Sequence, residues 1–193
     1  MRAIFVAARA FLPLLLTLSL LSGCGAQEAD VQAPTPAQAR AELAGSPAAL
    51  ASLHAQAAKL LDGGLDAYRA RLATLRGHPV VVNAWASWCG PCKYEMPYFS
   101  RAAVRFGRRV AFVGINAGDL SRDDARAFLR EHFVPFPSYV DPHDQIAQEV
   151  GVRAGLPTTV FYGRDGKVAY VHQGRYRDEA ALVADVTRYA GAS

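Results

Sequence analysis

The sequence predicts an α/β fold whose sheet ends in a hairpin. Short runs of consecutive apolar residues, typical of strands buried on both faces, alternate with stretches of helical periodicity. From residue 80 onward the predicted elements follow the order β-α-β-α-β-α-β-β-α, so the chain closes with a hairpin and a helix. With 193 residues, 51% of them hydrophobic, the chain can bury one such core and still carry accessory sequence.

A secretory signal peptide is predicted at residues 1–23. Arg2 and Arg9 precede an apolar run, 10–21, that is too short to span a membrane comfortably. The run ends in Leu21-Ser22-Gly23-Cys24, which resembles the bacterial lipobox, where cleavage falls before the cysteine and the sulfur then carries a diacylglycerol. The alternatives are an ordinary signal peptide or an uncleaved anchor. We therefore expect the rest of the chain to lie outside the cytoplasm, held by a lipid at Cys24 to the bacterial cell membrane or envelope.

Two accessory segments are predicted between this signal and the domain. Residues 24–46 are expected to be a flexible tether, because they are rich in Ala, Gln, Pro and Glu and have little apolar content. Residues 47–64 are expected to be an N-terminal helical extension, since apolar residues recur with a helical period from 47 to 61 and Asp62-Gly63-Gly64 ends the pattern. The α/β domain is then predicted at 65–193 and begins with a helix over 65–75.

The remaining elements of the domain follow from local patterns. Strands are predicted at 80–86, 110–116, 138–140, 158–162 and 167–172, and helices at 91–106, 121–133, 143–150 and 178–189. Ser121 is a suitable N-cap for its helix, with Asp123 and Asp124 in the first turn. Gly163-Arg164-Asp165-Gly166 is a turn signal that joins the last two strands as a hairpin.

The charge of the chain gives no support to nucleic-acid binding. The formal net charge of +4 falls to about +2 once Arg2 and Arg9 leave with the signal peptide. No basic patch is interleaved with aromatic residues, so we expect no nucleic-acid partner.

The chemistry of the chain is predicted to reside in Trp88-Cys89-Gly90-Pro91-Cys92. Two cysteines two residues apart, at a strand-to-helix turn, form a dithiol that can close to a disulfide and reopen. Cys89 lies just before the predicted helix, where free N–H groups and the helix dipole favour a thiolate. Cys92 lies one turn inside the helix and is suited to resolve a mixed disulfide. We expect no cofactor other than this redox-active disulfide.

A zinc site is the alternative interpretation of two cysteines at this spacing. Zinc usually takes four protein ligands, and the sequence contains neither a second CxxC nor an HxxxH pattern. The histidines are scattered along the chain, at His54, His78, His132, His143 and His172. We therefore predict no metal site.

The segment from Val81 to Pro97, VVNAWASWCGPCKYEMP, resembles the membrane-anchored thioredoxin-like proteins of the TlpA/ResA/DsbE group. The resemblance covers about Leu65 to the C-terminus. It implies a thioredoxin-like three-layer α/β/α fold with a mixed sheet and an added helix-strand insertion at about 117–140. It also implies extracytoplasmic thiol–disulfide exchange, which several members of the group use in cytochrome c maturation.

Further site residues are implied by the same resemblance. Glu95 completes a CxxCxxE pattern and could exchange a proton with the resolving thiol, because Asn83 stands where thioredoxin itself has a buried Asp. The alternative for Glu95 is a solvated position on the helix surface. Leu156 and Pro157 match the loop that carries the cis-proline of the group, against the alternative of an ordinary trans proline. With Trp88, Gly90 and Pro91 they are expected to shape a substrate groove.

Four functions remain open on this basis. The first is a reductant of protein disulfides that draws electrons from a membrane thiol-redox partner. The second is an oxidase of the same fold that passes electrons to such a partner. The third is a peroxiredoxin-type peroxidase of the AhpC/TSA kind, although Ala86 stands three residues before Cys89, where that nucleophile pattern has Thr. The fourth is a lipid-tethered binding module with an unused dithiol.

Overall fold

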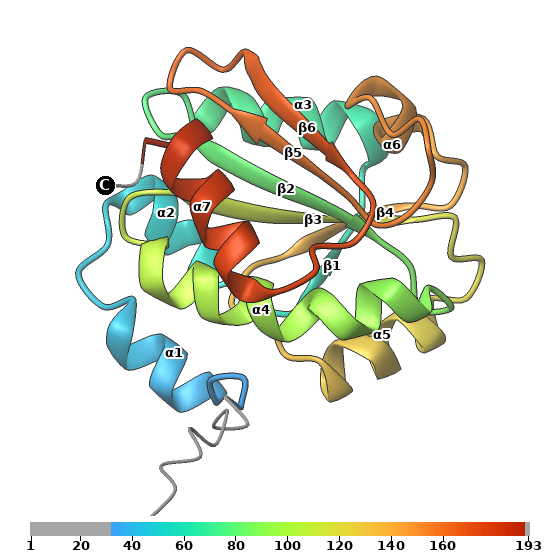
Figure 1. Cartoon of the computed structure of the whole chain (residues 1–193), viewed down its shortest axis with the longest axis horizontal. Helices are drawn as coiled ribbons and strands as arrows, with labels where there is room; N and C mark the ends of the chain where they lie inside the picture. Colours follow the sequence, from blue (N-terminus) through green and yellow to red (C-terminus); the bar gives the residue numbers. More distant parts are fainter. Residues whose placement is uncertain (1–31, 192–193) are drawn as a thin grey trace, which may run out of the picture. The chain divides into compact units, whose positions relative to one another are not determined.

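A six-stranded sheet with the order β1-β4-β3-β2-β5-β6 lies at the centre of the computed structural model, which describes residues 32–191 (Figure 1). Neighbouring strands from β1 through β4 and β3 to β2 are parallel, whereas β5 and β6 run antiparallel to their neighbours. The prediction of a mixed sheet ending in a hairpin is confirmed. The strands are β1 Leu60–Leu61, β2 Val80–Trp85, β3 Ala111–Ala117, β4 Ser138–Asp141, β5 Thr158–Tyr162 and β6 Val168–Gln173.

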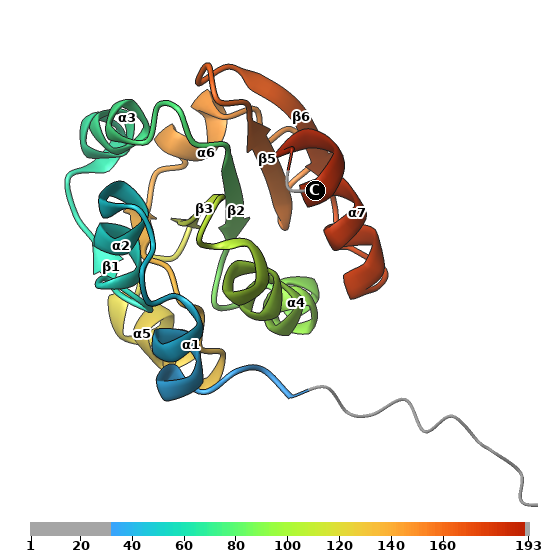
Figure 2. The ribbon, with the colours of Figure 1, turned by 90° about the vertical axis from the view of Figure 1, so that its left-hand side faces the viewer.

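Helices cover both faces of this sheet. The helices of the described residues are α1 Pro36–Glu42, α2 Ala48–His54, α3 Gly64–Thr74, α4 Gly90–Phe106, α5 Arg122–Glu131, α6 Gln145–Glu149 and α7 Glu179–Tyr189. Buried side chains of α4, α5 and α7 form one core, and those of α2, α3 and α6 form the other. Figure 2 shows α3 and α6 on one side of the sheet and α4 on the opposite side. The three-layer α/β/α arrangement is therefore confirmed.

The central strand β2 divides its side chains between the two cores. All six of its residues are buried, because helices cover both of its faces. Val81 and Trp85 point into the core under α4, and Trp85 stacks on Phe128 of α5 with ring centroids 4.5 Å apart. The period of two along a strand places Asn83 on this same face. A polar side chain of the central strand therefore lies beneath α4.

Helix α4 begins at the CxxC motif for local reasons. Cys89 is its N-cap, with extended backbone angles (φ −80°, ψ 100°). Pro91 lies in the first turn, where its missing N–H costs nothing and its fixed φ favours the helix. The strand before it, β2, pairs in parallel with β3 up to Trp85 and Asn116, so the motif directly follows the paired end of the strand.

The N-terminal segments differ from their prediction in two ways. Residues 36–42 lie in the segment predicted as a flexible tether, yet they form α1, which Thr35 and Gln38 begin with a reciprocal capping box. Ala39 of α1 and Leu43 just after it are buried, and Leu43 packs against Gly107 at the end of α4. The prediction of a tether rested on average composition, which does not reveal a capping motif or a few buried apolar residues. The capping box and these apolar residues form the helix and pack it against the domain.

The predicted helix over 47–61 is wrong in its second half. Helix α2 ends at His54, and Ala58 has a left-handed backbone with φ 54°. Leu60 and Leu61 then form β1, which pairs in parallel with β4 at the edge of the sheet. Adjacent apolar residues such as Leu60 and Leu61 can form a strand where a neighbouring strand has an unpaired edge. Here β4 supplies that edge, and its position follows only from the tertiary structure. The predicted N-terminal extension therefore contributes a strand to the domain.

The predicted signal peptide and Cys24 lie outside the described residues. Within residues 32–191, no helix is long and apolar enough to cross a membrane.

Candidate active site

The two cysteines of the motif are joined by a disulfide at the N-terminus of α4. The Cys89 and Cys92 sulfurs are 2.04 Å apart. Cys89 is 3% exposed and Cys92 is fully buried. The backbone N–H of Cys92 donates a hydrogen bond to Cys89 Sγ, at 3.2 Å. A sulfur that caps a helix in this way lies at the positive end of the helix dipole, and this positive end stabilises a thiolate.

Glu95 lies one turn further along α4 and is fully buried. Its Oε1 accepts a hydrogen bond from Asn83 Nδ2 of β2, and its Oε2 accepts one from the backbone N–H of Tyr176, each 3.0 Å long. Residues three apart on a helix share a face, so Glu95 and Cys92 project into the same core. The alternative of a solvated helix-surface glutamate is therefore wrong. We call Glu95, Asn83 and the Tyr176 N–H the floor of the site.

Burial dominates the acidity of Glu95. Loss of hydration raises its pKa, because the ionised form is poorly solvated in the core. The hydrogen bonds from Tyr176 and Asn83 and the charge of Arg175 favour the carboxylate and lower the pKa. Burial is the larger effect, and together these influences raise the pKa from 4.5 to about 7. The result is a carboxyl group that can gain or lose a proton near neutral pH.

The loop that supplies the Tyr176 N–H is fixed by its own side chain. The Tyr176 ring stacks on His172 with centroids 4.0 Å apart, and its hydroxyl donates to Asp185 of α7 at 2.9 Å. Burial and the neighbouring carboxylate raise the Tyr176 pKa well above its usual value. Nothing in the sequence points to this role of Tyr176, because the residue lies 81 positions from Glu95 and contributes a backbone group, which leaves no side-chain signal.

The bond between Leu156 and Pro157 is cis, as the family resemblance implies. Pro157 is buried directly before β5, and its carbonyl accepts a hydrogen bond from Gly174 N–H at 2.9 Å. Gly174 belongs to the same loop as Tyr176. Leu156 packs against the core that contains both cysteines. The proline loop and the loop that binds Glu95 are therefore linked by their backbones.

The segment that leads into the dithiol is bound by Asp119, in the loop between β3 and α5. Asp119 is 5% exposed. Its two carboxylate oxygens accept hydrogen bonds from the Ser87 N–H and the Ser87 hydroxyl, both at 2.7 Å, and from Asn116 Nδ2 at 2.6 Å. The Trp88 indole N–H donates to Gly118 O at 3.4 Å. We call Ser87, Trp88 and the loop 118–120 the rim of the site.

The exposure of the predicted groove residues differs along the motif. Trp88 is 66% exposed, and Gly90 and Pro91 are also exposed, whereas Leu156 is half-buried and Pro157 is buried. The CxxC motif points to Trp88, but no sequence pattern points to Asp119, which lies 30 residues after Cys89 in a loop without a recognisable motif.

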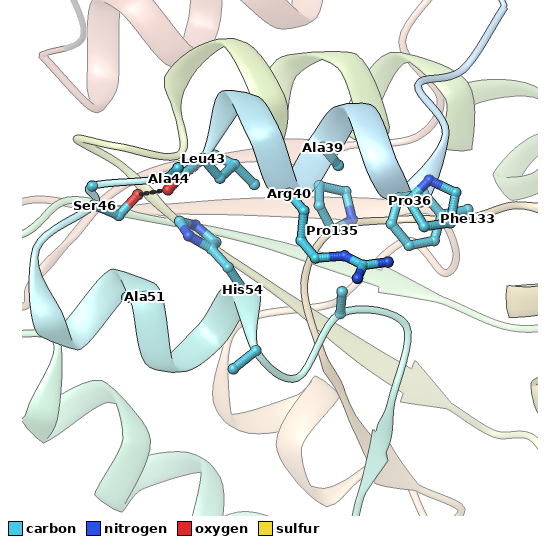
Figure 3. Close-up of a pocket in the computed structure, with 13 residues that line it drawn as sticks. Pro36, Ala39, Arg40, Leu43, Ala44, Ser46, Ala51, His54, Phe133 and Pro135 are labelled. Carbon is cyan, nitrogen blue, oxygen red and sulfur yellow. Dashed lines mark hydrogen bonds between the residues drawn. The ribbon is translucent and has the colours of Figure 1, made fainter.

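The described part of the chain holds no metal cluster, and its best-defined cavity lies away from the disulfide. Within residues 32–191, no three His, Cys, Asp or Glu side chains are placed to share a metal ion. A cavity of about 610 Å³ lies between α1, α2 and residues 133–135 (Figure 3). None of its 13 lining residues belongs to the floor, to the rim or to the predicted site. The site is therefore a nearly buried disulfide at the start of α4, with a buried carboxyl group one helical turn beyond it.

Relatives with the same fold are named for thiol–disulfide chemistry. The chain is 35% identical over 107 residues to the thiol-disulfide oxidoreductase ResA of Bacillus subtilis, an alignment that covers 55% of this chain and 59% of that protein. A solved structure from Chlorobium tepidum, titled as a thiol:disulfide interchange protein DsbE, has a TM-score of 0.57 and 31% identity, over 62% of this chain and 85% of that one. This likeness confirms the thioredoxin-like fold.

A second solved structure is a secreted disulfide oxidoreductase of Mycobacterium tuberculosis, described as homologous to E. coli DsbE. It has a TM-score of 0.54 and 26% identity, over 60% of this chain and 85% of that one. The match to the ResA relative spans about three fifths of that protein's length. The AhpC/TSA family profile matches residues 52–171, which is more than half of the chain. The chain belongs to the AhpC/TSA family.

Proposed function

We propose that this member of the AhpC/TSA family is a thiol–disulfide oxidoreductase that exchanges its Cys89–Cys92 pair with disulfides of other proteins. The observation that carries the proposal is a disulfide at a helix N-terminus with the buried Glu95 one turn below it. The names of the ResA and DsbE relatives support the same chemistry.

In the proposed reductive direction, the Cys89 thiolate attacks one sulfur of a substrate disulfide. The substrate S–S bond breaks, a mixed disulfide forms, and the other substrate sulfur leaves as a thiolate that takes up a proton. Cys92 then loses its proton and attacks the Cys89 sulfur. This step closes the Cys89–Cys92 disulfide and releases the second substrate thiol, so two electrons pass to the substrate. A dithiol donor must restore the pair for the next cycle.

Glu95 is proposed to accept the proton of Cys92 in the second step. An ionised carboxylate with a pKa of about 7 is a suitable base near neutral pH, because it is neither fully protonated nor too weakly basic. Asn83 has no proton of suitable acidity to exchange, so its contribution is the hydrogen bond that orients the carboxylate.

The setting we propose is the outer side of a bacterial membrane, with a lipid at Cys24 as the anchor. The signal-like residues 1–23 support this location, and one similar protein is described as secreted. The electron donor would then be a membrane thiol-redox protein, and apocytochrome c is the substrate we propose, following the TlpA/ResA/DsbE resemblance. The reverse flow of electrons, in which the pair acts as an oxidase, uses the same residues.

The direction is tested by the reduction potential of the Cys89–Cys92 pair. A potential of about −270 mV fits a reductant, and one of about −120 mV fits an oxidant. A peroxidase of the AhpC/TSA kind is disfavoured by Ala86, which offers no hydroxyl three residues before Cys89.

The enzymatic proposal is tested by insulin reduction with dithiothreitol as the donor. We expect turnover with the native chain, none with Cys89→Ala, and a trapped mixed disulfide with Cys92→Ala. Cys24→Ser is the matched control, since it removes the cysteine that lies outside the dithiol. Insulin reduction no faster than that of Cys89→Ala would contradict the proposal, and rapid consumption of hydrogen peroxide would favour a peroxidase.

A further inference from the structure

The hydrogen bonds of Glu95 suit only one of its two protonation states. In the described part of the chain both of its partners are donors, namely Asn83 Nδ2 and the backbone N–H of Tyr176. A carboxylate only accepts hydrogen bonds, so these donors satisfy it, whereas a carboxylic acid must also donate one. A buried O–H group without an acceptor is costly. The acid form, which Glu95 adopts when it takes the Cys92 proton, therefore needs a further acceptor.

Two buried oxygen atoms of the sheet have no hydrogen-bond partner within residues 32–191. They are Oδ1 of Asn83 and the hydroxyl Oγ1 of Thr159, whose side chains belong to residues that are 1% and 0% exposed. Buried polar atoms nearly always have a partner, so each such atom calls for an explanation. Valine has the shape of threonine and favours strands as well, so a hydroxyl that bonds to nothing only weakens the fold at this position.

The pairing of the strands places these two oxygens side by side. Strand β5 lies between β2 and β6, and Thr159 is opposite Asn83 of β2 on one side and His172 of β6 on the other (Figure 1). Side chains opposite each other in antiparallel strands lie on the same face, with Cβ atoms about 5 Å apart. Phe161, two residues further along β5, belongs to the core under α4. Thr159 therefore projects towards α4, as Asn83 does.

The carboxyl group of Glu95 lies over this row of residues. Asn83 of β2 binds it on one side, and on the other it is bound by the N–H of Tyr176, whose ring stacks on His172 of β6. Its two oxygens are thus held from both sides of β5. Thr159, the residue of β5 between Asn83 and His172, therefore lies beneath the carboxyl group.

We propose that Thr159 is the positioning residue for the acid form of Glu95. When Glu95 takes up the proton of Cys92, its new O–H donates to Thr159 Oγ1. The Thr159 hydroxyl donates its own hydrogen to Asn83 Oδ1, so no proton leaves it. A hydroxyl can accept and donate at once, and both unpartnered oxygens gain a bond in this state. The inference rests on the proposed disulfide exchange and adds a group that stabilises Glu95 after the proton transfer.

The charged and titratable groups around Glu95 belong to other elements than β2 and β5. They are Arg175 and Tyr176 in the loop after β6, His172 of β6, Asp185 of α7, and the two cysteines of α4. Arg175 carries a positive charge that favours the carboxylate and lowers the Glu95 pKa. Substitution of Thr159 leaves all of these groups in place, so a change of the Glu95 pKa in such a variant reports the hydroxyl.

Thr159→Val tests the assignment, because it keeps the shape of the side chain and removes only the hydroxyl. The acid form of Glu95 loses its acceptor while the carboxylate keeps both donors, so the pKa should fall. We expect a fall of about 0.7, the roughly 5-fold change in an equilibrium that one hydrogen bond between neutral groups usually gives. Carbon-13 NMR of the Glu95 carboxyl group from pH 4 to 9 measures it in the oxidised protein, where Cys89 and Cys92 do not titrate. Glu95→Gln identifies the signal.

Two further threonine variants are the controls. Thr159→Ser keeps the hydroxyl and should retain the native pKa. Thr158→Val removes a hydroxyl from the opposite face of β5, where it donates to Gly155 O, and should also leave the pKa of Glu95 unchanged. A merely structural role of Thr159 predicts another result. Loss of an unpartnered buried hydroxyl would then stabilise the fold equally at every pH, without a change in the pKa.

Two results would overturn the proposal. One is an unchanged pKa of Glu95 in Thr159→Val, and the other is a higher pKa, which would mean that the hydroxyl donates to the carboxylate instead. Failure of the proposed function looks different. In that case the native protein does not reduce insulin, while the pKa of Glu95 in the oxidised protein still falls in Thr159→Val.

Discussion

The floor and the rim of the site each contain a buried carboxyl group, and the two are held differently. Glu95 in the floor accepts two hydrogen bonds, one from a side chain of the central strand and one from a distant backbone N–H. Asp119 in the rim accepts three, all from Ser87 and Asn116 beside the motif. Burial raises the pKa of Glu95 to about 7. The role we propose for the floor is proton exchange, whereas the bonds of Asp119 connect the rim to the segment before the dithiol.

The most severe test of this division is the floor variant Glu95→Gln. It keeps the shape of the side chain but removes the base that we assign to Cys92. We expect release of substrate from the mixed disulfide to slow by about 10²- to 10⁴-fold, the range of general acid–base catalysis. The inflection of that rate near pH 7 should disappear as well. Rapid-quench measurement of mixed-disulfide decay from pH 5 to 9 checks both, and an unaltered profile would assign proton transfer elsewhere.

The second test uses stability instead of rate. Glu95 has a higher pKa in the folded protein than the 4.5 of an exposed glutamate, so folding favours its protonated form. Its contribution to stability is complete below about pH 4.5 and is lost as the pH rises through about 7. The full loss is about 3 kcal/mol, which corresponds to the difference between these two pKa values.

Urea unfolding of the disulfide-intact protein at pH 4.5, 6 and 8 measures this loss. Glu95→Gln is the reference, because all other groups titrate alike in both proteins and their effects cancel. The native chain should lose stability relative to the variant across this range. A constant difference at all three pH values would show that the pKa of Glu95 is the same in the folded and the unfolded chain.

A smaller effect is expected from Asn83→Ala. The amide of Asn83 donates to the Glu95 carboxylate and therefore favours its ionised form. Loss of a hydrogen bond to a charged group costs about 1.5 kcal/mol, so the pKa of Glu95 should rise by about 1 unit. The pH midpoint of mixed-disulfide decay reports this shift.

Ser87→Ala is the control from the rim for this midpoint. It removes the hydroxyl bond to Asp119 and leaves the backbone bond from the Ser87 N–H. The midpoint should stay in place, because Glu95 keeps both of its donors. If the pH midpoint moved as far as it does in Asn83→Ala, the bonds of the rim would influence the pKa of Glu95. The distinction between floor and rim would then be wrong.

Local patterns predicted most of the fold because they act over a few residues. The apolar run of β2, the helix start at Cys89 and the Gly-rich hairpin turn before β6 are each specified by adjacent side chains. The errors lie where a distant partner decides the outcome. Leu60 and Leu61 become a strand because β4 offers them an edge, and α1 is ordered because Leu43 finds a surface at Gly107.

The candidate site divides in the same way. The sequence by itself determined the dithiol, the turn that presents it and the presence of a carboxyl group one helical turn beyond it, since all of these follow from spacing along one segment. Only the tertiary structure decided that Glu95 is buried, that Tyr176 and Asn83 bind it, and that Asp119 holds Ser87. These contacts join residues from different strands and loops, and desolvation, which sets the pKa of Glu95, exists only once the chain has closed around it.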